Sequence, residues 1–144
     1  MADDAKAGAP PGSMSANLTF IGLMKKAGAL AIGAENGYDS ARMGKAKILC
    51  LASDAARNTV DGAHNALAEG RAILVKLPYN KRELGAALGQ QECAALAVTD
   101  LGFALSLCQK LGLESETHEL SARLEREKRR KAKKRKTSSK GDRV

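Results

Sequence analysis

The stretch KILCLA, residues 47–52, decides the fold class because it is apolar and lacks the alternation of a half-exposed strand. A strand of this kind is covered on both of its faces, as in sheets that have a layer of helices on each side. Three further short apolar runs read as strands: LAI at 30–32, AILVKL at 72–77 and AALAVT at 94–99. We therefore predict a sheet of about four strands that is largely buried.

Helical patterns alternate with these strands. Apolar residues recur at helical spacing, and most of the patterns end at a glycine. The third helix is expected to begin after Ser53 or Asp54 as its cap and to end before Gly70. The other expected helices are Asn17–Ala27, Glu35–Met43, Arg82–Leu88 and Asp100–Leu111. The alternation predicts an α/β fold, a three-layer α/β/α sandwich with a mixed sheet of about four strands and helices on both faces.

Length and composition define three zones. The 144 residues suffice for one domain, and with 44% hydrophobic but only 3% aromatic residues its core must consist of aliphatic side chains and alanine. Residues 1–14, rich in Ala, Gly and Pro, are expected to form a flexible leader. Residues 15–113 hold the periodic sequence and form the predicted domain. Residues 114–144 are a basic tail, either helical or disordered.

The positive charge is concentrated in the tail. The chain has a net charge of +8, yet residues 123–144 alone carry 12 Lys and Arg against 3 Asp and Glu. A basic segment of this kind indicates a nucleic-acid partner, with a solubilising tail as the alternative. Since its last clear apolar residue is Leu124, we expect no hydrophobic stripe to dock it on the core. Nonspecific phosphate contacts are expected from Arg129, Arg130, Lys131, Lys133, Lys134 and Arg135.

The residues needed for catalysis or metal binding do not form a known pattern. His64 lies on a predicted helix and His118 in the tail, while Cys50 and Cys108 fall at core positions and Cys93 in a loop. No CxxC, HExxH, dinucleotide or P-loop motif occurs. We therefore expect no enzyme activity, cofactor, metal or small-molecule substrate.

Apolar stretches, the first residues and the cysteines indicate the cellular compartment. No stretch approaches the ~18 apolar residues of a membrane span, and Asp3 and Asp4 near the start argue against a secretory signal. Three scattered cysteines form no disulfide framework, which favours a reducing cytoplasm. The oligomeric state is not determined by these features, and we take the monomer as the expectation.

One strand-to-helix junction stands out as a ligand site. At Gly33-Ala34-Glu35-Asn36, backbone N–H groups and small side chains leave room for a ligand. The amide and carboxylate of the first helical turn can hydrogen-bond base edges. The alternative is a turn glycine followed by ordinary helix-start residues. Phosphate contacts around the junction are expected from Lys25, Lys26, Lys45 and Lys47.

Four segments carry a family resemblance. They are IGLMKKAGALAIGAEN at 21–36, GKAKILCLASDAARNT at 44–59, ELGAALG at 83–89 and AVTDLGFA at 97–104. With these, the chain from Phe20 to Leu111 resembles the ribosomal protein seven-Ae type family of kink-turn RNA-binding proteins, in particular its small bacterial members. The resemblance implies a three-layer α/β/α fold, RNA binding without catalysis, and an association with the ribosome or translation.

The resemblance also implies a two-part RNA surface. Residues 33–36 would enter the distorted groove beside tandem sheared G·A pairs, and the loop at 90–94 would pack on a flipped-out base. In that loop the implied contacts are Gln91, Glu92, Cys93 and Ala94. This sequence departs from the family pattern in the order Glu35-Asn36, in Gly37 and in Asp39, where the family has a lysine. Asp39, together with the negative charge that Glu92 adds to the same surface, favours the alternative of a protein-interaction module with the same fold.

The four aromatic residues are scattered, which does not favour recognition by base stacking. Phe20 and Phe103 fall on apolar helical faces and are expected in the core. Tyr38 and Tyr79 are expected to be more exposed, with Tyr38 close to the predicted groove.

Overall fold

The computed structural model describes residues 11–68 and 70–142, with side chains over residues 16–68 and 70–133. Helices and strands alternate over residues 11–110, as the sequence predicts, and one more helix follows. The elements are α1 (Pro11–Lys26), β1 (Leu30–Ile32), α2 (Ala34–Arg42), β2 (Ile48–Leu51), α3 (Arg57–Leu67), β3 (Ile73–Lys76), α4 (Lys81–Leu88), β4 (Ala95–Val98), α5 (Leu101–Lys110) and α6 (Glu114–Asp142).

The strands form one four-stranded mixed sheet with the order β1-β4-β2-β3. β4 is antiparallel to both β1 and β2, while β2 and β3 are parallel. Register places Ile32 opposite Leu96 and Ile48 opposite Ile73. It follows that β1, β2 and β3 run in one direction and end at the same edge of the sheet, where β4 begins.

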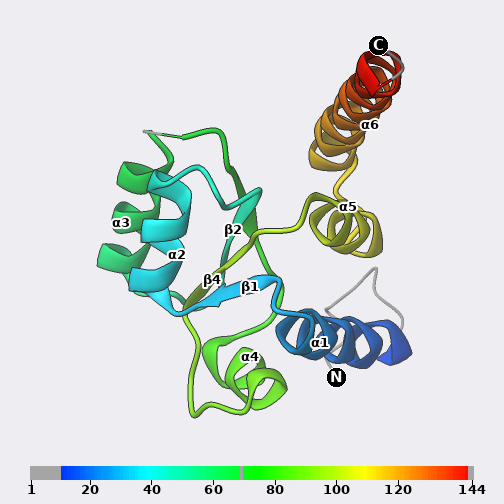
Figure 1. Ribbon diagram of the computed structural model, residues 1–144. Helices are drawn as coiled ribbons and strands as arrows, with labels where there is room; N and C mark the ends of the chain where they lie inside the picture. The colour runs from blue at the N-terminus through cyan, green and yellow to red at the C-terminus, as the bar shows by residue number, and fades with distance from the viewer. Residues whose placement is uncertain (1–10, 69, 143–144) are drawn as a thin grey trace.

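Helices cover both faces of the sheet, which confirms the predicted sandwich (Figure 1). α2 and α3 cover one face, whereas α1, α4 and α5 cover the other. The buried side chains under α2 and α3 are Tyr38, Ala41, Ala46, Leu49, Leu51, Ala63, Ala66, Ala95 and Ala97. The largest buried side chains on the other face include Ile21, Met24, Ile48, Tyr79, Leu84, Leu88, Leu96, Leu107 and Leu120.

Two glycines let the α2–α3 layer pack closely. A Cβ added at Gly37 would lie 3.1 Å from Leu49 Cδ1, so α2 rests directly on the sheet. A Cβ at Gly62 would lie 2.7 Å from the ring of Tyr38, so α3 leaves a slot for that ring. The layer is thin because these positions lack side chains.

The two tyrosines are buried, and the prediction that they are more exposed is wrong. Tyr38 retains 7% of its exposure in the slot beside Gly62, and its hydroxyl donates to Thr59 O at 2.8 Å. Tyr79 retains 2%, and its hydroxyl accepts a hydrogen bond from Asn17 Nδ2 at 3.0 Å. In each case a polar partner satisfies the hydroxyl inside the core, so burial is favourable. Phe20 and Phe103 meet edge to face at 5.7 Å and pack against the main core as expected.

The start of α6 packs on the domain, which corrects the expectation that nothing in the tail docks. Leu120 is fully buried and Leu124 packs against the same core cluster. Arg123 Nη1 donates to Arg71 O at 3.0 Å, and its Nε pairs with Glu119 at 2.9 Å. The hydrophobic core therefore extends past residue 113.

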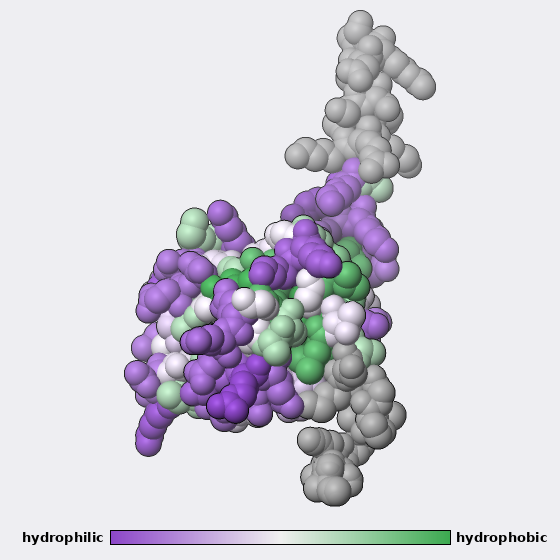
Figure 2. All heavy atoms as spheres, turned by 90° about the horizontal axis from the view of Figure 1, so that it is seen from below, coloured by the Kyte–Doolittle hydropathy of each residue, from purple (hydrophilic) through white to green (hydrophobic). Residues whose placement is uncertain are grey.

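Beyond Leu124, α6 leaves the body of the molecule. Its 29 residues correspond to a length of about 43 Å, and the described part forms a hydrophilic projection (Figures 1 and 2). Lys, Arg, Glu and Ala have high helix propensity, which lets the helix continue without a packed face.

Helix starts differ from expectation by more than one residue at two places. α1 begins at Pro11 rather than Asn17, so helix occupies the end of the predicted leader, whose first ten residues lie outside the described part. Proline suits the first helical position because its missing N–H would have no partner there. α3 begins after Ala56 without a side-chain cap. Asp54 instead accepts a hydrogen bond from the Lys81 N–H at 2.8 Å, and thereby joins the start of α4 to the end of β2.

Candidate nucleic-acid interface

The carboxyl ends of three strands meet at one edge of the sheet. Gly33 N–H donates to Ala95 O at 2.9 Å, which ties the start of α2 to β4. Ligands of open α/β sheets commonly bind outside the carboxyl ends of the strands. We call this region the Gly33 edge, defined by residues 33–36, 52–57, 78–82 and 90–94.

Backbone hydrogen bonds hold the segments of the Gly33 edge together. Ser53 N–H donates to Tyr79 O at 2.8 Å, and Cys93 N–H donates to Lys81 O at 3.0 Å. Asn80 forms a capping box with Glu83 at the start of α4, with both bonds at 2.8 Å. The edge is therefore a set of turns fixed by main-chain contacts rather than a group of independent loops.

Gly33 leaves an opening at the start of α2. It is the N-cap residue of this helix, with φ 99° and ψ 157°, a backbone region that only glycine adopts readily. No heavy atom lies within 4 Å of the position a Cβ would occupy. The N-terminal amides of a helix carry partial positive charge, so an anionic or polar ligand can approach the backbone here.

The polar residues after Gly33 point to solvent. Glu35 and Asn36 are both exposed. Asn36 Nδ2 donates to Ile32 O at 2.8 Å, which orients the amide across the end of β1. Its Oδ1 and second amide hydrogen remain for a ligand, so one side chain offers both an acceptor and a donor.

The loop before β4 packs tightly on α4. A Cβ at Gly85 would lie 2.7 Å from Gln91 O and 2.8 Å from Gln90 O, so the loop backbone lies directly on the helix. Gln91 and Glu92 are exposed and Ala94 is half-buried. Because Gly33 N–H donates to Ala95 O, the end of this loop lies beside Gly33.

Cys93 differs from its neighbours in the loop because its side chain points inward. It retains 2% of its exposure, and its thiol donates to Ala95 O at 3.3 Å. Burial raises the pKa of this thiol, while backbone hydrogen bonds with Gly33 and Ala95 act in the opposite direction. Cys93 thus supports the junction between α2 and β4 from inside and does not present its side chain to a ligand.

Only one of the four predicted lysines lies near the loop. Lys25 Nζ donates to Leu88 O at 2.7 Å at the end of α4, next to the start of the loop. Lys26 is exposed at the end of α1. Lys45 and Lys47 precede β2 and therefore lie at the opposite edge of the sheet, so the structure does not bring them to Gly33.

Three other cations occupy the Gly33 edge. Arg57 is the first residue of α3 and is exposed. Lys81 and Arg82 are the first two residues of α4; Lys81 is half-buried and Arg82 is exposed. They follow the carboxyl ends of β2 and β3, which run parallel with β1. Sequence reasoning missed them because it placed cations by closeness in the chain. Their position after predicted strands could have identified them, since parallel strands bring the segments that follow them to one edge of the sheet.

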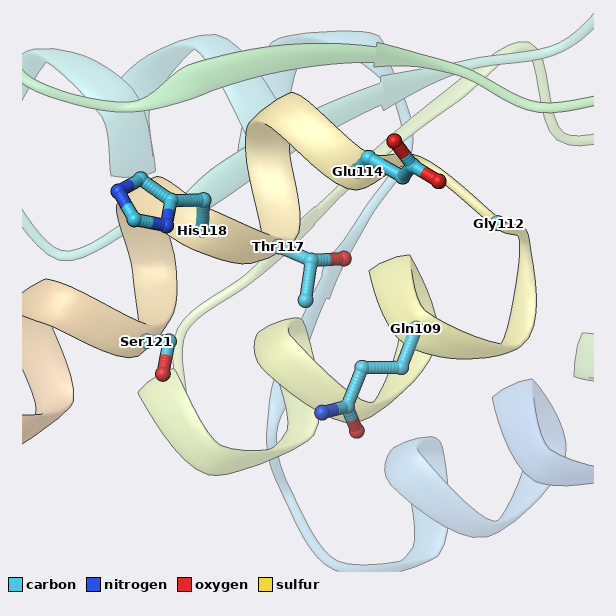
Figure 3. A pocket seen from close by; sticks show the side chains of 6 residues that line it. All are labelled: Gln109, Gly112, Glu114, Thr117, His118 and Ser121. Atoms are coloured by element: carbon cyan, nitrogen blue, oxygen red, sulfur yellow. The ribbon is translucent and has the colours of Figure 1, made fainter.

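An open hollow of about 430 Å³ lies between α5 and α6 (Figure 3), and none of its lining residues belongs to the Gly33 edge. Gln109 on α5 lies opposite Thr117 on α6, and Thr117 Oγ1 is buried without a hydrogen-bond partner. The other lining residues are Gly112, Glu114, His118 and Ser121.

Groups with displaced pKa values lie elsewhere in the described part of the chain. Burial raises the pKa of Tyr38 and Tyr79, and raises that of the Cys108 thiol to about 11. Cys50 is fully buried and its pKa is raised further in the same direction. None of these groups lines the hollow, which therefore lacks the pairing of cleft and perturbed group that marks many catalytic sites.

Two absences hold for the described residues. No group of three or more His, Cys, Asp or Glu there could hold a metal ion. No helix in that part of the chain has the length and apolar character required to cross a membrane.

Comparison with known proteins identifies the family. A model of the ribosomal protein L7Ae/L30e/S12e/Gadd45 family matches residues 18–107. The chain belongs to this family. The match confirms the resemblance seen in the sequence, and it includes Gly33 and the loop before β4. None of the curated proteins matches the chain.

Solved structures share the fold of this family member. A protein of unknown function from Bacillus halodurans is 25% identical, with a TM-score of 0.61, and the match covers 67% of this chain and 96% of that one. The Giardia lamblia 15.5kD RNA binding protein is 18% identical, with a TM-score of 0.56, and the match covers 75% of this chain and 92% of that one.

Proposed function

We propose that the protein binds structured RNA without catalysis and that the Gly33 edge recognises the RNA. The observation that carries the proposal is the open backbone at Gly33, placed beside the exposed loop before β4 at the carboxyl ends of three strands. Family membership supports it, as does the structural likeness to a protein described as RNA binding. The RNA we propose is bent, of the kink-turn kind, and ribosomal or otherwise part of translation.

Each part of the edge has a proposed role. Gly33 and Ala34 let the RNA backbone approach α2 closely, while Glu35 and Asn36 hydrogen-bond base edges. Gln91, Glu92 and Ala94 form the surface against which an unstacked base packs. Arg57, Lys81 and Arg82 supply the phosphate contacts that Lys45 and Lys47 are too remote to make at this edge.

The basic helix adds affinity that is insensitive to sequence. Arg129, Arg130 and Lys131 are exposed along α6, and so is Lys133. The side chains of Lys134 and Arg135 lie outside the described part. Each phosphate contact to single-stranded RNA contributes a slope of about −0.7 to the dependence of log affinity on log salt concentration. The helix is therefore proposed to lengthen residence, while the Gly33 edge selects the RNA shape.

A binding comparison tests the proposal on the full chain. The probes are a hairpin with a three-nucleotide bulge followed by tandem G·A pairs, and a straight duplex with the same stems. We expect tighter binding to the bent hairpin, and Glu35→Ala with Asn36→Ala should remove about 1–3 kcal/mol per lost base contact. The matched control is Asp61→Ala with Asn65→Ala, an acid and an amide exposed on α3. Equal affinities for the two probes in the unmodified protein would refute recognition of bent RNA.

The acidic groups at the edge favour one alternative, a protein-interaction module. Glu35, Asp54 and Glu92 are exposed at the Gly33 edge, and Asp39, farther along α2, is exposed and forms an ion pair with Arg42 at 3.2 Å. These carboxylates repel phosphates. A purified protein that elutes free of nucleic acid and fails to shift ribosomal RNA would favour this alternative.

A further inference from the structure

The edge of the sheet opposite Gly33 carries a second set of cations. β1, β2 and β3 begin there and β4 ends there. Lys47 N–H donates to Val98 O at 2.7 Å, and Lys47 O accepts from Ile73 N–H at 3.1 Å, so this residue sits between β4 and β3. We call this region, residues 45–47, 71–72 and 99–100, the Lys47 edge.

The base of α6 is joined to the Lys47 edge. Arg123 Nη1 donates to Arg71 O at 3.0 Å, which anchors the helix beside the start of β3. Leu120 and Leu124, on the same part of α6, pack against the core. The cations of the Lys47 edge therefore lie next to the base of the basic helix, which projects from this side of the domain (Figure 1).

Two acidic groups near the Lys47 edge already form a hydrogen bond or an ion pair within the protein. Asp100 caps α5 by accepting from the Phe103 N–H at 2.9 Å, and Glu119 pairs with Arg123 at 2.9 Å. Lys45 and Arg71 are exposed and Lys47 is half-buried. On the Gly33 edge, the exposed carboxylates of Glu35, Asp54 and Glu92 lie near the cations, and Asp54 is engaged by the Lys81 N–H at 2.8 Å.

We propose that the Lys47 edge and the adjoining α6 form a second RNA-binding surface, which takes single-stranded backbone, so that the protein holds two RNA segments at opposite ends of its sheet. This inference rests on the proposal that the protein binds RNA. The residues assigned are Lys45, Lys47 and Arg71, continued by Arg126 and Arg130 on α6. A cationic surface without aromatic platforms reads phosphates rather than bases, so the segment bound here is not selected by its sequence.

The test compares two pairs of lysines in the full chain. K45Q/K47Q removes two cations from the Lys47 edge, and K76Q/K110Q removes two exposed cations elsewhere, with the same change in net charge. The probe is a 20-nucleotide oligouridylate. For K45Q/K47Q we expect roughly tenfold weaker binding at low salt, and a salt slope reduced by about 1.4, whereas K76Q/K110Q should bind as the unmodified protein does. Equal losses in both pairs would refute the proposal, since net charge alone would then explain binding.

A second measurement asks whether two RNAs bind together. Protein saturated with the bent hairpin is mixed with labelled oligouridylate, and the complexes are resolved on a native gel. We expect a ternary complex; stoichiometric displacement of the hairpin would overturn the inference. If the bent hairpin binds no better than the straight duplex, the proposed role of the Gly33 edge fails, while the comparison of lysine pairs still decides this proposal.

Discussion

The two ends of the sheet are built on different physical principles. At the Gly33 edge, main-chain hydrogen bonds and close packing fix the positions of α2, α4 and the loop before β4. At the Lys47 edge, long cationic side chains and the anchored base of α6 provide the distinguishing features. The first end is suited to recognising a shape, because main-chain contacts fix its turns around an open glycine, and the second to holding a polyanion, because its cations continue along one helix.

The largest effect is expected at the base of α6. Leu120→Ala removes a fully buried side chain and should reduce the free energy of unfolding by about 2–5 kcal/mol. Urea denaturation measures the change, and Leu23→Ala, at a position 51% exposed, is the control expected to change it little. A small effect for Leu120→Ala would mean that α6 is not part of the cooperative core and that its base is not held beside the Lys47 edge by packing.

Gly85→Ala should disturb the Gly33 edge next most strongly. The new Cβ would lie 2.7–2.8 Å from two backbone carbonyls of the loop, which cannot rotate away as a side chain does. We expect a loss of about 1–3 kcal/mol in unfolding free energy and weaker binding of the bent hairpin, with oligouridylate binding kept. Ala86→Ser, on the exposed side of the same helix, is the control. Parallel loss of both RNAs would argue against two separate surfaces.

Two glycines allow the backbone of the two ends to be compared directly. Gly33 has φ 99° and ψ 157°, whereas Gly44, which precedes the Lys47 edge, has φ 77°. Gly33→Asn should cost about 1–3 kcal/mol because non-glycine residues are strained there. Gly44→Asn should cost less, since asparagine tolerates a positive φ near this value better than most residues do. Thermal unfolding of both variants measures the difference, and equal costs would contradict the special role of Gly33.

The smallest effect concerns the thiols. Burial raises the pKa of Cys93, and raises that of Cys108 to about 11, so both favour the neutral form in the folded state. A raised folded pKa adds stability below the unfolded pKa of about 8.5, and this is lost as pH rises toward the folded value. We therefore expect slow reaction with a thiol reagent at pH 8 and falling stability above pH 9. Rapid modification of Cys93 in the native protein would mean that it faces the ligand after all.

Much of the fold could be predicted from local patterns. Runs such as 47–52 indicate buried strands because they lack alternation, and the helical spacing between them implies covering helices. The burial of Tyr38 could not be predicted from local patterns, because it depends on the space that Gly62, on another helix, leaves for the ring. Leu120 was missed because Leu120 and Leu124 form only a short apolar pattern in an otherwise polar helix, yet Leu120 completes the core.

Part of the candidate site could likewise be predicted from local sequence, and part could not. The strand-to-helix junction at Gly33 and the polar first turn of α2 were recognisable from residues 30–36, because neighbours in the chain form them. Which cations surround that junction depended on strand direction. Arg57 and Lys81 arrive there because β2 and β3 run parallel with β1, while Lys47 is left at the other end. Local sequence determines turns and helix starts, whereas pairing between distant strands decides which of them become neighbours.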